Sequence, residues 1–141
     1  MTLQICRTTV SSVLNKDSKQ YGKAHLFDGN PETCWNSDHG SPQWIQIHLQ
    51  SPVRLAAIRV QFQGGFSGLD TSLEAWNDEH TTGLVRNEVL SLFPKDNHLI
   101  QTFPVQFSEP YSHYRLVFHS STDFYGRITV YHLELVPTNE G

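Results

Sequence analysis

The feature that most constrains the fold is a set of short segments in which apolar and polar residues alternate one by one. In "WIQIHL", residues 44–49, isoleucine and leucine alternate with glutamine and histidine, and "IRVQFQ", residues 58–63, has the same period of two. "YRLVFH", residues 114–119, is similar. Alternate residues share one face of a strand, so the pattern is typical of strands with one buried face. Turn formers such as "DGNP" and "HGSP" separate the segments.

The segment "ITVYHLELV", residues 128–136, changes phase. Val130 and Tyr131 are both apolar, and from Tyr131 onward the apolar residues fall on the other parity. This phase change predicts a β-bulge near Tyr131. Pro104 predicts that the strand around it is broken or lies at a sheet edge. Only a single helical turn is expected, over residues 17–22. The chain is therefore predicted to be all-β, a sandwich or barrel of about eight short strands.

Size and charge limit the classes of function. With 141 residues, the chain is expected to form a single domain, residues 1–141. Ten basic and 14 acidic residues give a net charge of −4, so we expect no direct nucleic-acid binding. There is no run of about 20 apolar residues and no signal-peptide pattern, so neither a membrane span nor secretion is expected. Cys6 and Cys34 are expected to be reduced, with a single bridge as the alternative.

Catalytic motifs are missing. The residues around Ser67 read "GFSGL", which is not a G-x-S-x-G elbow, and the chain has no phosphate-binding glycine loop and no H-E-x-x-H. The eight histidines are scattered, without a pair four residues apart. We therefore expect no enzyme and no required cofactor. A zinc site or a metal-dependent enzyme built from distant histidines is the alternative that the sequence leaves open.

The stretch "HLFDGNPETCWNSDHG", residues 25–40, combines turn formers with oxygen-bearing side chains. The pairs at 28–29 and 30–31 each favour a turn, and Trp35 is expected to anchor the stretch to the core. The oxygens of this loop raise the question of calcium, which takes six to eight oxygen ligands. An EF-hand is excluded because the positions that need glycine and glutamate hold Thr33 and His39.

The same stretch carries a family resemblance. The pattern D-G-x-x-x-T-x-W, followed by a polar loop and W-I-x-I-x-L, resembles the opening of discoidin or coagulation-factor type C domains. Its matching residues are Asp28, Gly29, Thr33, Trp35, Trp44, Ile45, Ile47 and Leu49. The resemblance implies a galactose-binding-like fold, an antiparallel jelly-roll sandwich of about eight strands. It also implies calcium as a candidate ligand, held by the D-G loop and by a glutamate of the last strand. That glutamate would align at or near His132, and the nearest one is Glu134. The candidate calcium ligands are Asp28, Asn30, Thr33 and Glu134.

Four further blocks resemble a narrower family of nuclear receptor-associated regulators: "CWNSDHGSPQW", "QFQGGFS", "FPKDNHLIQTFP" and "TDFYGRITVYHL". This resemblance implies a non-enzymatic intracellular protein-interaction module, nuclear or cytoplasmic. It would bind an orphan nuclear receptor, the testicular one, and repress its transactivation. The alternative is a carbohydrate- or lipid-binding module, supported by calcium, that takes a small glycan.

In folds of this type partners meet loops at one end, and three loops are candidates: residues 36–43, 63–68 and 120–127. The candidate binding residues are Asn36, Asp38, His39, Gln63, Phe66, Asp123, Phe124 and Arg127. Aromatic and arginine side chains are common anchors of protein interfaces. Phe66 is expected to be exposed between its glycines. For Phe124 and Tyr125 the alternative is that they plug the end of the sandwich, and for Asp123 and Arg127 that they pair with each other.

Overall fold

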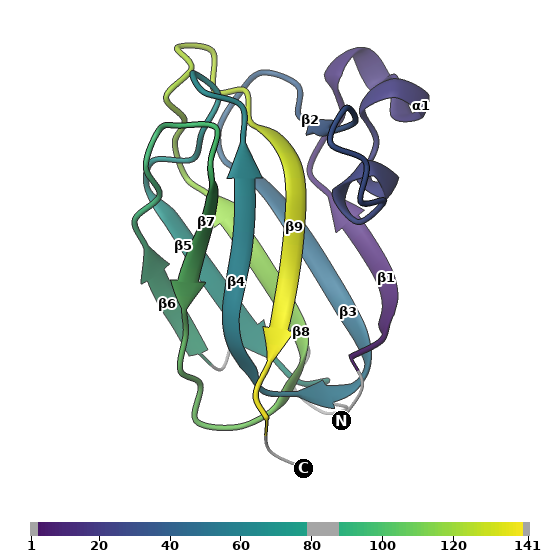
Figure 1. The fold of residues 1–141 in the computed structure, drawn as a ribbon, viewed down its shortest axis with the longest axis vertical. Helices are drawn as coiled ribbons and strands as arrows, with labels where there is room; N and C mark the ends of the chain where they lie inside the picture. Colours follow the sequence, from purple (N-terminus) through teal and green to yellow (C-terminus); the bar gives the residue numbers. More distant parts are fainter. Residues whose placement is uncertain (1–2, 79–87, 140–141) are drawn as a thin grey trace.

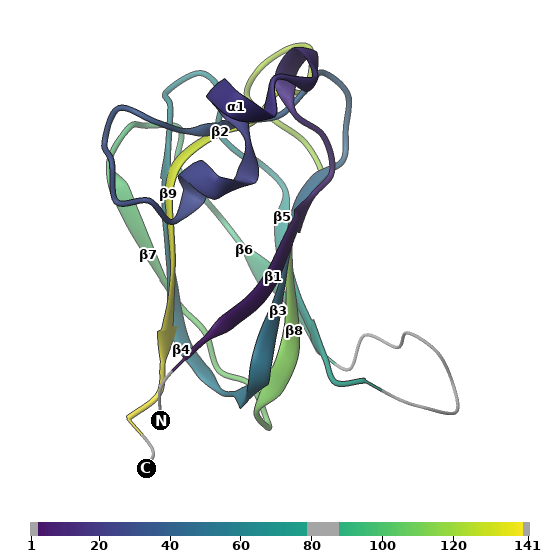
Figure 2. The same cartoon turned by 90° about the vertical axis from the view of Figure 1, so that its right-hand side faces the viewer.

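In the computed structural model, which describes residues 3–78 and 88–139, two antiparallel sheets pack face to face (Figures 1 and 2). The first sheet has the strand order β1 (Ile5–Val10), β3 (Gln43–Val53), β8 (Tyr111–Phe118), β5 (Thr71–Trp76), β6 (Glu88–Leu92). The second has the order β2 (Trp35–Asn36), β9 (Thr129–Pro137), β4 (Leu55–Phe62), β7 (Ile100–Pro104). The predicted all-β antiparallel jelly-roll sandwich is confirmed, with nine strands in the described residues.

The alternation in the sequence decides which face of each strand is buried. In β3 every second residue from Gln43 to Leu49 is buried, and in β4 Ile58, Val60 and Phe62 are buried while their neighbours are partly exposed. These apolar faces belong to one hydrophobic core between the two sheets. Burial of this apolar surface is the main force that holds the sandwich together.

The expected bulge lies at Tyr131. Gln61 of β4 pairs with His132, whereas the next residue, Phe62, pairs with Val130, so Tyr131 is the extra residue of β9. The bulge turns Tyr131 toward the outer face together with His132, where both line a groove described below. Pro104 is the last residue of β7, which is the edge strand of its sheet, as its missing N–H donor predicts.

Three short helical segments join β1 to β2: η1 (Leu14–Lys16), α1 (Ser18–Tyr21) and η2 (Lys23–Leu26). The Asp17 side chain accepts a hydrogen bond from the backbone N–H of Gln20 at 3.1 Å and caps α1, so the predicted helical turn is confirmed. η2 packs against β1, β2 and β9, at the end of the sandwich where α1 lies in Figure 2. Trp35 is fully buried and its indole N–H donates to the Ser12 carbonyl, which anchors the loop as expected.

The connections β2–β3, β4–β5 and β8–β9 all lie at one end of the sandwich, here called the loop end, whereas β1 begins and β9 finishes at the opposite end (Figure 1).

Both cysteines are free, Cys6 exposed and Cys34 buried, so the alternative of a Cys6–Cys34 bridge is wrong. None of the helices in the described part of the chain has the length and apolar character needed to cross a membrane.

Candidate functional site

Backbone hydrogen bonds interlock the three loops that the sequence singled out. The Gly40 N–H donates to the Tyr125 carbonyl at 2.7 Å, which joins the β2–β3 loop to the β8–β9 loop. The Thr122 N–H donates to the Ser67 carbonyl at 2.9 Å, and the Ser67 N–H donates to the Thr122 hydroxyl at 3.0 Å. The β8–β9 loop is thus bonded on both sides, and the loop end is a connected surface.

Gln43, the buried first residue of β3, fixes the β2–β3 loop from below. Its amide N–H group donates to the carbonyls of Asp38 at 3.2 Å and Gly40 at 2.9 Å. Its carbonyl oxygen accepts from the hydroxyls of Ser11 at 2.5 Å and Ser12 at 2.7 Å. Buried side-chain polar groups are costly unless they are bonded, so these four bonds hold the loop in one conformation. Gln43 is not among the predicted site residues, because an alternating pattern does not show which strand residue caps a loop.

Asp123 and Arg127 pair with each other, which confirms the alternative considered for them. The Arg127 guanidinium donates to both carboxylate oxygens of Asp123, at 2.9 and 3.2 Å, and the Arg127 N–H donates to one of them at 3.1 Å. The side-chain bond from Arg127 holds the pKa of the Asp123 carboxyl below its usual range. The same guanidinium lies 5.1 Å from the ring centre of Phe66 and 5.7 Å from that of Tyr125. Arg127 is thereby held between two aromatic rings.

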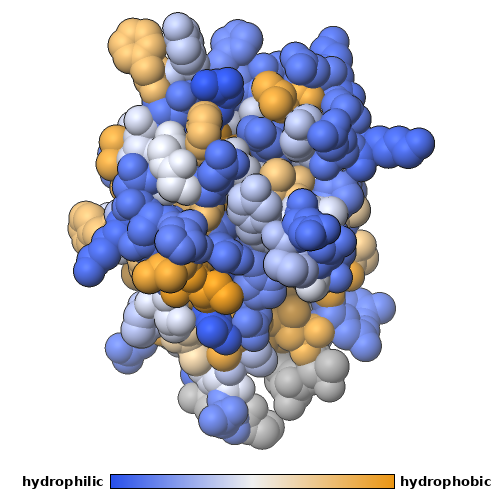
Figure 3. Space-filling model, turned by 45° about the horizontal axis from the view of Figure 1, so that its top comes forward, coloured by the Kyte–Doolittle hydropathy of each residue, from blue (hydrophilic) through white to orange (hydrophobic). Residues whose placement is uncertain are grey.

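The two aromatic residues between Asp123 and Arg127 point outward. Phe124 is 93% exposed and Tyr125 is 63% exposed, and their rings meet edge to face at 5.2 Å. The alternative that they plug the sandwich is therefore wrong. Phe66, by contrast, is half-buried beneath Arg127 rather than exposed between its glycines. Figure 3 shows the loop end tilted forward, with a mostly hydrophilic surface from which apolar side chains stand out in separate patches.

A groove of about 500 Å³ lies beside this turn. Three predicted residues, Asp38, His39 and Arg127, meet there, and the His39 ring lies 3.1 Å from the Asp38 carboxylate. The remaining lining residues are Leu14, Asn15 and Tyr125. Leu14 and Asn15 were not predicted as site residues, because only the path of η1 brings them to the loop end. The sequence offers one weak indication of this path. Asn15 has a φ of 54°, and asparagine tolerates such a positive φ better than most residues.

Asp123 and Phe124 belong to the turn beside this groove and Phe66 lies beneath its Arg127, whereas the remaining two predicted residues, Asn36 and Gln63, lie apart from both. Asn36 is not in a loop but in β2, opposite Thr129 of β9, and its buried side-chain oxygen Oδ1 has no hydrogen-bond partner in the described residues. Gln63 lines a different groove, with His98 and Tyr131 on the outer side of the four-stranded sheet. Asn36 lies in the short strand β2, which the alternation did not predict, and Gln63 directly follows the end of β4 at Phe62.

The Asp28 turn brings three of the four candidate calcium ligands together, but as a hydrogen-bonded corner. One Asp28 carboxylate oxygen accepts from the Asn30 N–H at 2.9 Å, and the other accepts from the Thr33 hydroxyl at 2.5 Å and lies 3.1 Å from the His25 ring. The Asn30 side-chain oxygen accepts from the Glu32 N–H at 2.9 Å. Led by the bond from Thr33, these contacts lower the pKa of the Asp28 carboxyl to about 2.

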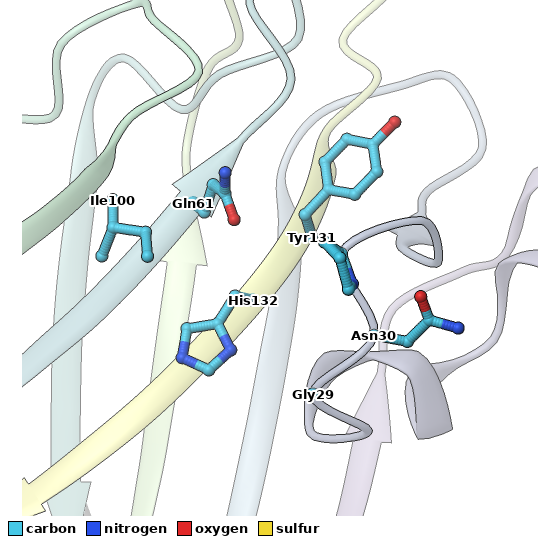
Figure 4. Close-up of a pocket in the computed structure, with 7 residues that line it drawn as sticks. Gly29, Asn30, Gln61, Ile100, Tyr131 and His132 are labelled. Atoms are coloured by element: carbon cyan, nitrogen blue, oxygen red, sulfur yellow. The ribbon is translucent and has the colours of Figure 1, made fainter.

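The fourth candidate, Glu134, lies on β9 and its carboxylate is 3.4 Å from the Arg59 guanidinium. The residues of β9 nearest the Asp28 turn are instead Tyr131 and His132, which line a groove of about 290 Å³ with Gly29 and Asn30 (Figure 4). The oxygens of the turn thus already accept hydrogen bonds, and the imidazole of His132 lies where the family resemblance led us to expect a glutamate. The side chains of Asp28, Asn30 and Thr33 supply fewer oxygens than the six to eight that calcium takes, so as arranged these residues do not fit calcium.

Comparison with known proteins agrees with this architecture. The family model of the F5/8 type C domain matches residues 7–123. Nuclear receptor 2C2-associated proteins are similar over almost the whole chain. The one from Danio rerio is 43% identical, covering 94% of this chain and 93% of the relative, and the one from Homo sapiens is 40% identical, covering 94% of each. The one from Xenopus laevis is 48% identical, covering 90% of each.

Two solved structures show the same fold at low sequence identity. The family 32 CBM from C. perfringens NanJ, in complex with galactose, has a TM-score of 0.71 at 16% identity, covering 95% of this chain and 98% of that one. Chitosan-binding module 2 of the Paenibacillus sp. IK-5 chitosanase/glucanase, in complex with chitotriose, has a TM-score of 0.70 at 21% identity, covering 92% and 95%. The family resemblance expected from the motifs is confirmed, and the chain belongs to the nuclear receptor 2C2-associated proteins within the F5/8 type C domain family.

Proposed function

We propose that this chain is an intracellular protein-interaction module that binds the nuclear receptor 2C2 of its own organism and represses transactivation by that receptor. The name of the relatives supports the receptor as the partner. The observation that supports the loop end as the docking surface is the exposed pair Phe124 and Tyr125. Under this proposal the chain works where the receptor is found, in the nucleus or the cytoplasm.

The physical reason for choosing this surface is its preorganisation. Exposing an apolar ring such as Phe124 to water is unfavourable, so burial against a partner returns that free energy. The turn that carries both rings is already held by the Asp123–Arg127 pair and by the bond from Gly40 to Tyr125. Little backbone entropy is then lost on binding, which favours affinity. Aromatic anchors of this kind often dominate the energy of an interface.

We also propose that the chain is not an enzyme and needs no cofactor. Among the six residues that line the loop-end groove, the only carboxylate is that of Asp38, and its neighbour His39 is largely exposed, at 77% of its side chain. A general acid or base is normally tuned by burial and by close charged neighbours. The groove provides little burial for His39.

The test is direct binding of the purified receptor to wild-type protein and to the double variant Phe124→Ala/Tyr125→Ala. We expect the double variant to bind at least about 30-fold more weakly, which corresponds to the loss of about 2 kcal/mol. Phe93→Ala is the matched control. Phe93 is 81% exposed, but it lies directly after β6 and outside the β8–β9 loop. A reporter gene driven by the receptor should be repressed by wild type and by the control, but not by the double variant. Equal binding by all three proteins would refute the loop end as the docking surface, and no binding by wild type would refute the partner.

A second candidate function is glycan binding in the loop-end groove. The observation that favours it is the lining itself, where the exposed ring of Tyr125 lies beside the polar side chains of Asp38 and Arg127. Sugars present an apolar face that stacks on aromatic rings and hydroxyls that bond polar groups. Galactose and chitotriose are suitable probes, with Tyr125→Ala as the variant. Saturable binding that this variant abolishes would support the glycan function, and the absence of saturable binding by either sugar would count against it.

A further inference from the structure

Three residues far apart in sequence meet on the outer face of the five-stranded sheet, away from the loop-end groove. His48 of β3 and His113 of β8 are directly opposite each other in the antiparallel register. His113 is also opposite Trp76 of β5, and Asp78 follows two residues after that strand ends. Among the described residues, these two histidines and Asp78 form the one group of three or more His, Cys, Asp or Glu whose ligand atoms all lie within 4.8 Å of one another.

The His113 ring is held rigidly. It stacks on the His48 ring at 4.3 Å between ring centres, with an interplanar angle of 11°. On its other neighbouring strand it stacks on the Trp76 ring at 5.1 Å and 6°. Only 7% of the His113 side chain is exposed, and its Nε2 lies 2.8 Å from an Asp78 carboxylate oxygen. Asp78 itself is 64% exposed and closes the group on the solvent side.

We infer that His48, His113 and Asp78 form a binding site for a divalent transition-metal ion such as Zn²⁺. Two imidazole nitrogens and one carboxylate oxygen are a ligand set that suits these ions, with water completing the shell. Ligands placed about 2.0–2.1 Å from a tetrahedral metal lie about 3.3 Å from one another. The distance from His113 Nε2 to the Asp78 oxygen must therefore increase from 2.8 Å. The three ligand atoms, which lie within 4.8 Å of one another, must otherwise move closer together.

The side chains that must move are the ones free to do so. Parallel stacked rings direct their nitrogens along parallel planes, so the partly exposed His48 has to tilt toward the metal while His113 stays in place. Asp78 is exposed enough to shift by about half an ångström. The Nδ1 atom of His113 has no hydrogen-bond partner among the described residues. Its tautomer is therefore free to put the hydrogen on Nδ1, which leaves the lone pair of Nε2 for the metal.

One electrostatic effect on this group favours the binding of a metal ion, and another opposes it. A metal needs a neutral imidazole, and the burial of the His113 side chain, which is only 7% exposed, disfavours the charged form. The positive charge of Arg7, which pairs with His48 in the sheet register, acts on His113 as well and opposes a second cation. The carboxylate of Asp78 offsets that charge. Binding is therefore expected to depend strongly on Asp78, although it is the most exposed of the three ligands.

The experiment is a Zn²⁺ titration by calorimetry on tag-free, chelator-treated protein, with the absorption spectrum of the Co²⁺ form as a second measurement. We expect one Zn²⁺ per chain and the visible bands of four-coordinate Co²⁺. His48→Gln and Asp78→Asn should each weaken binding at least about tenfold. His48 is partly exposed and Asp78 is 64% exposed, so neither substitution disturbs the core, and circular dichroism verifies that each variant is folded.

The matched control is His39→Gln, because His39 and Asp38 form another exposed histidine–aspartate pair, at the loop end. It should bind Zn²⁺ as wild type does. Calcium should not compete, since it prefers oxygen ligands. Wild-type protein without a 1:1 Zn²⁺ complex, or His48→Gln and Asp78→Asn variants that bind as wild type does, would overturn the site. So would a control that loses binding.

Discussion

Replacing Gly126 with alanine tests the contact between the β2–β3 and β8–β9 loops, on which the exposed aromatic pair depends. Gly126 has a φ of +85°, a conformation that residues with a Cβ rarely adopt. A Cβ at this position would lie 2.7 Å from the carbonyl oxygen of Gly40 and 2.7 Å from the hydroxyl oxygen of Ser41. Both distances are far shorter than an ordinary carbon–oxygen contact, and the first involves backbone, so the two loops have to separate.

The expected loss of stability has two parts. The left-handed conformation costs a residue with a Cβ about 1–2 kcal/mol. Forcing an extra carbon into a packed contact costs about 1–3 kcal/mol more. We therefore expect Gly126→Ala to lower the free energy of unfolding by about 2–5 kcal/mol, a large share of the stability of a small domain. With a urea dependence near 2 kcal/mol per molar, the midpoint of unfolding would fall by about 1–2.5 M.

Substitutions of two other glycines of the loop end, measured in the same urea titration, separate the conformational cost from the steric cost. Gly65 has a φ of +88°, but a Cβ added there would meet no atom within 4 Å, so Gly65→Ala should show the conformational cost alone. Gly64 has neither feature, so Gly64→Ala should leave stability unchanged or raise it by up to about 1 kcal/mol. If Gly126→Ala destabilised the protein no more than Gly65→Ala does, the close contact with the β2–β3 loop would not hold the turn, and the reasoning would be refuted.

Three further predictions concern the corners of the fold. Gln43→Ala should lower the free energy of unfolding by about 2–4 kcal/mol in urea denaturation, because it removes four part-buried hydrogen bonds. Gln50→Ala, at an exposed position of the same strand, is the control. The pKa of Asp28 is lowered to about 2 in the folded state, so its charged form favours folding. That contribution is fully present above about pH 4 and is lost as pH falls toward 2, and thermal unfolding from pH 2 to 6 should show a shallower pH dependence for Asp28→Asn than for wild type. Calcium or EDTA should leave the melting temperature unchanged, because hydrogen bonds already occupy the Asp28 oxygens, and a rise on adding calcium that Asp28→Asn abolishes would contradict this.

The parts of the fold that depend on local pattern could be predicted from the sequence. Alternation identified the buried faces of β3 and β4, and the change of phase placed a bulge near Tyr131, where the structure has it. These features are predictable because a strand has a period of two, and a shift by one residue would move its apolar side chains into water. The capping aspartate at Asp17 is local in the same sense, since cap and capped N–H are three residues apart.

The orientation of loop side chains could not be predicted in the same way. Phe66 lies between glycines, which suggested exposure, yet Arg127 covers it, and the pair Phe124–Tyr125 is exposed instead. Which ring is covered depends on where the Arg127 guanidinium lies, and that depends on its bonds to Asp123. The pairing was foreseen as an alternative, but its consequence for the neighbouring rings requires the three-dimensional path of the turn.

The pairing of His48 with His113 could not be predicted from the sequence either, because it depends on the register of strands that are distant in the chain. His48 and His113 are separated by 65 positions, and only the pairing of β3 with β8 places one opposite the other. His48 lies five residues along β3 from Gln43, the residue that fixes the loop end, which is about 17 Å along an extended strand. At that distance a metal ion held by His48 does not touch the side chains of the loop end. Coupling would require a second arrangement of the sheet, and the core packing of β3 against its neighbours opposes one. Zn²⁺ and the receptor are therefore expected to bind independently, so that the Phe124→Ala/Tyr125→Ala variant keeps the metal affinity of wild type.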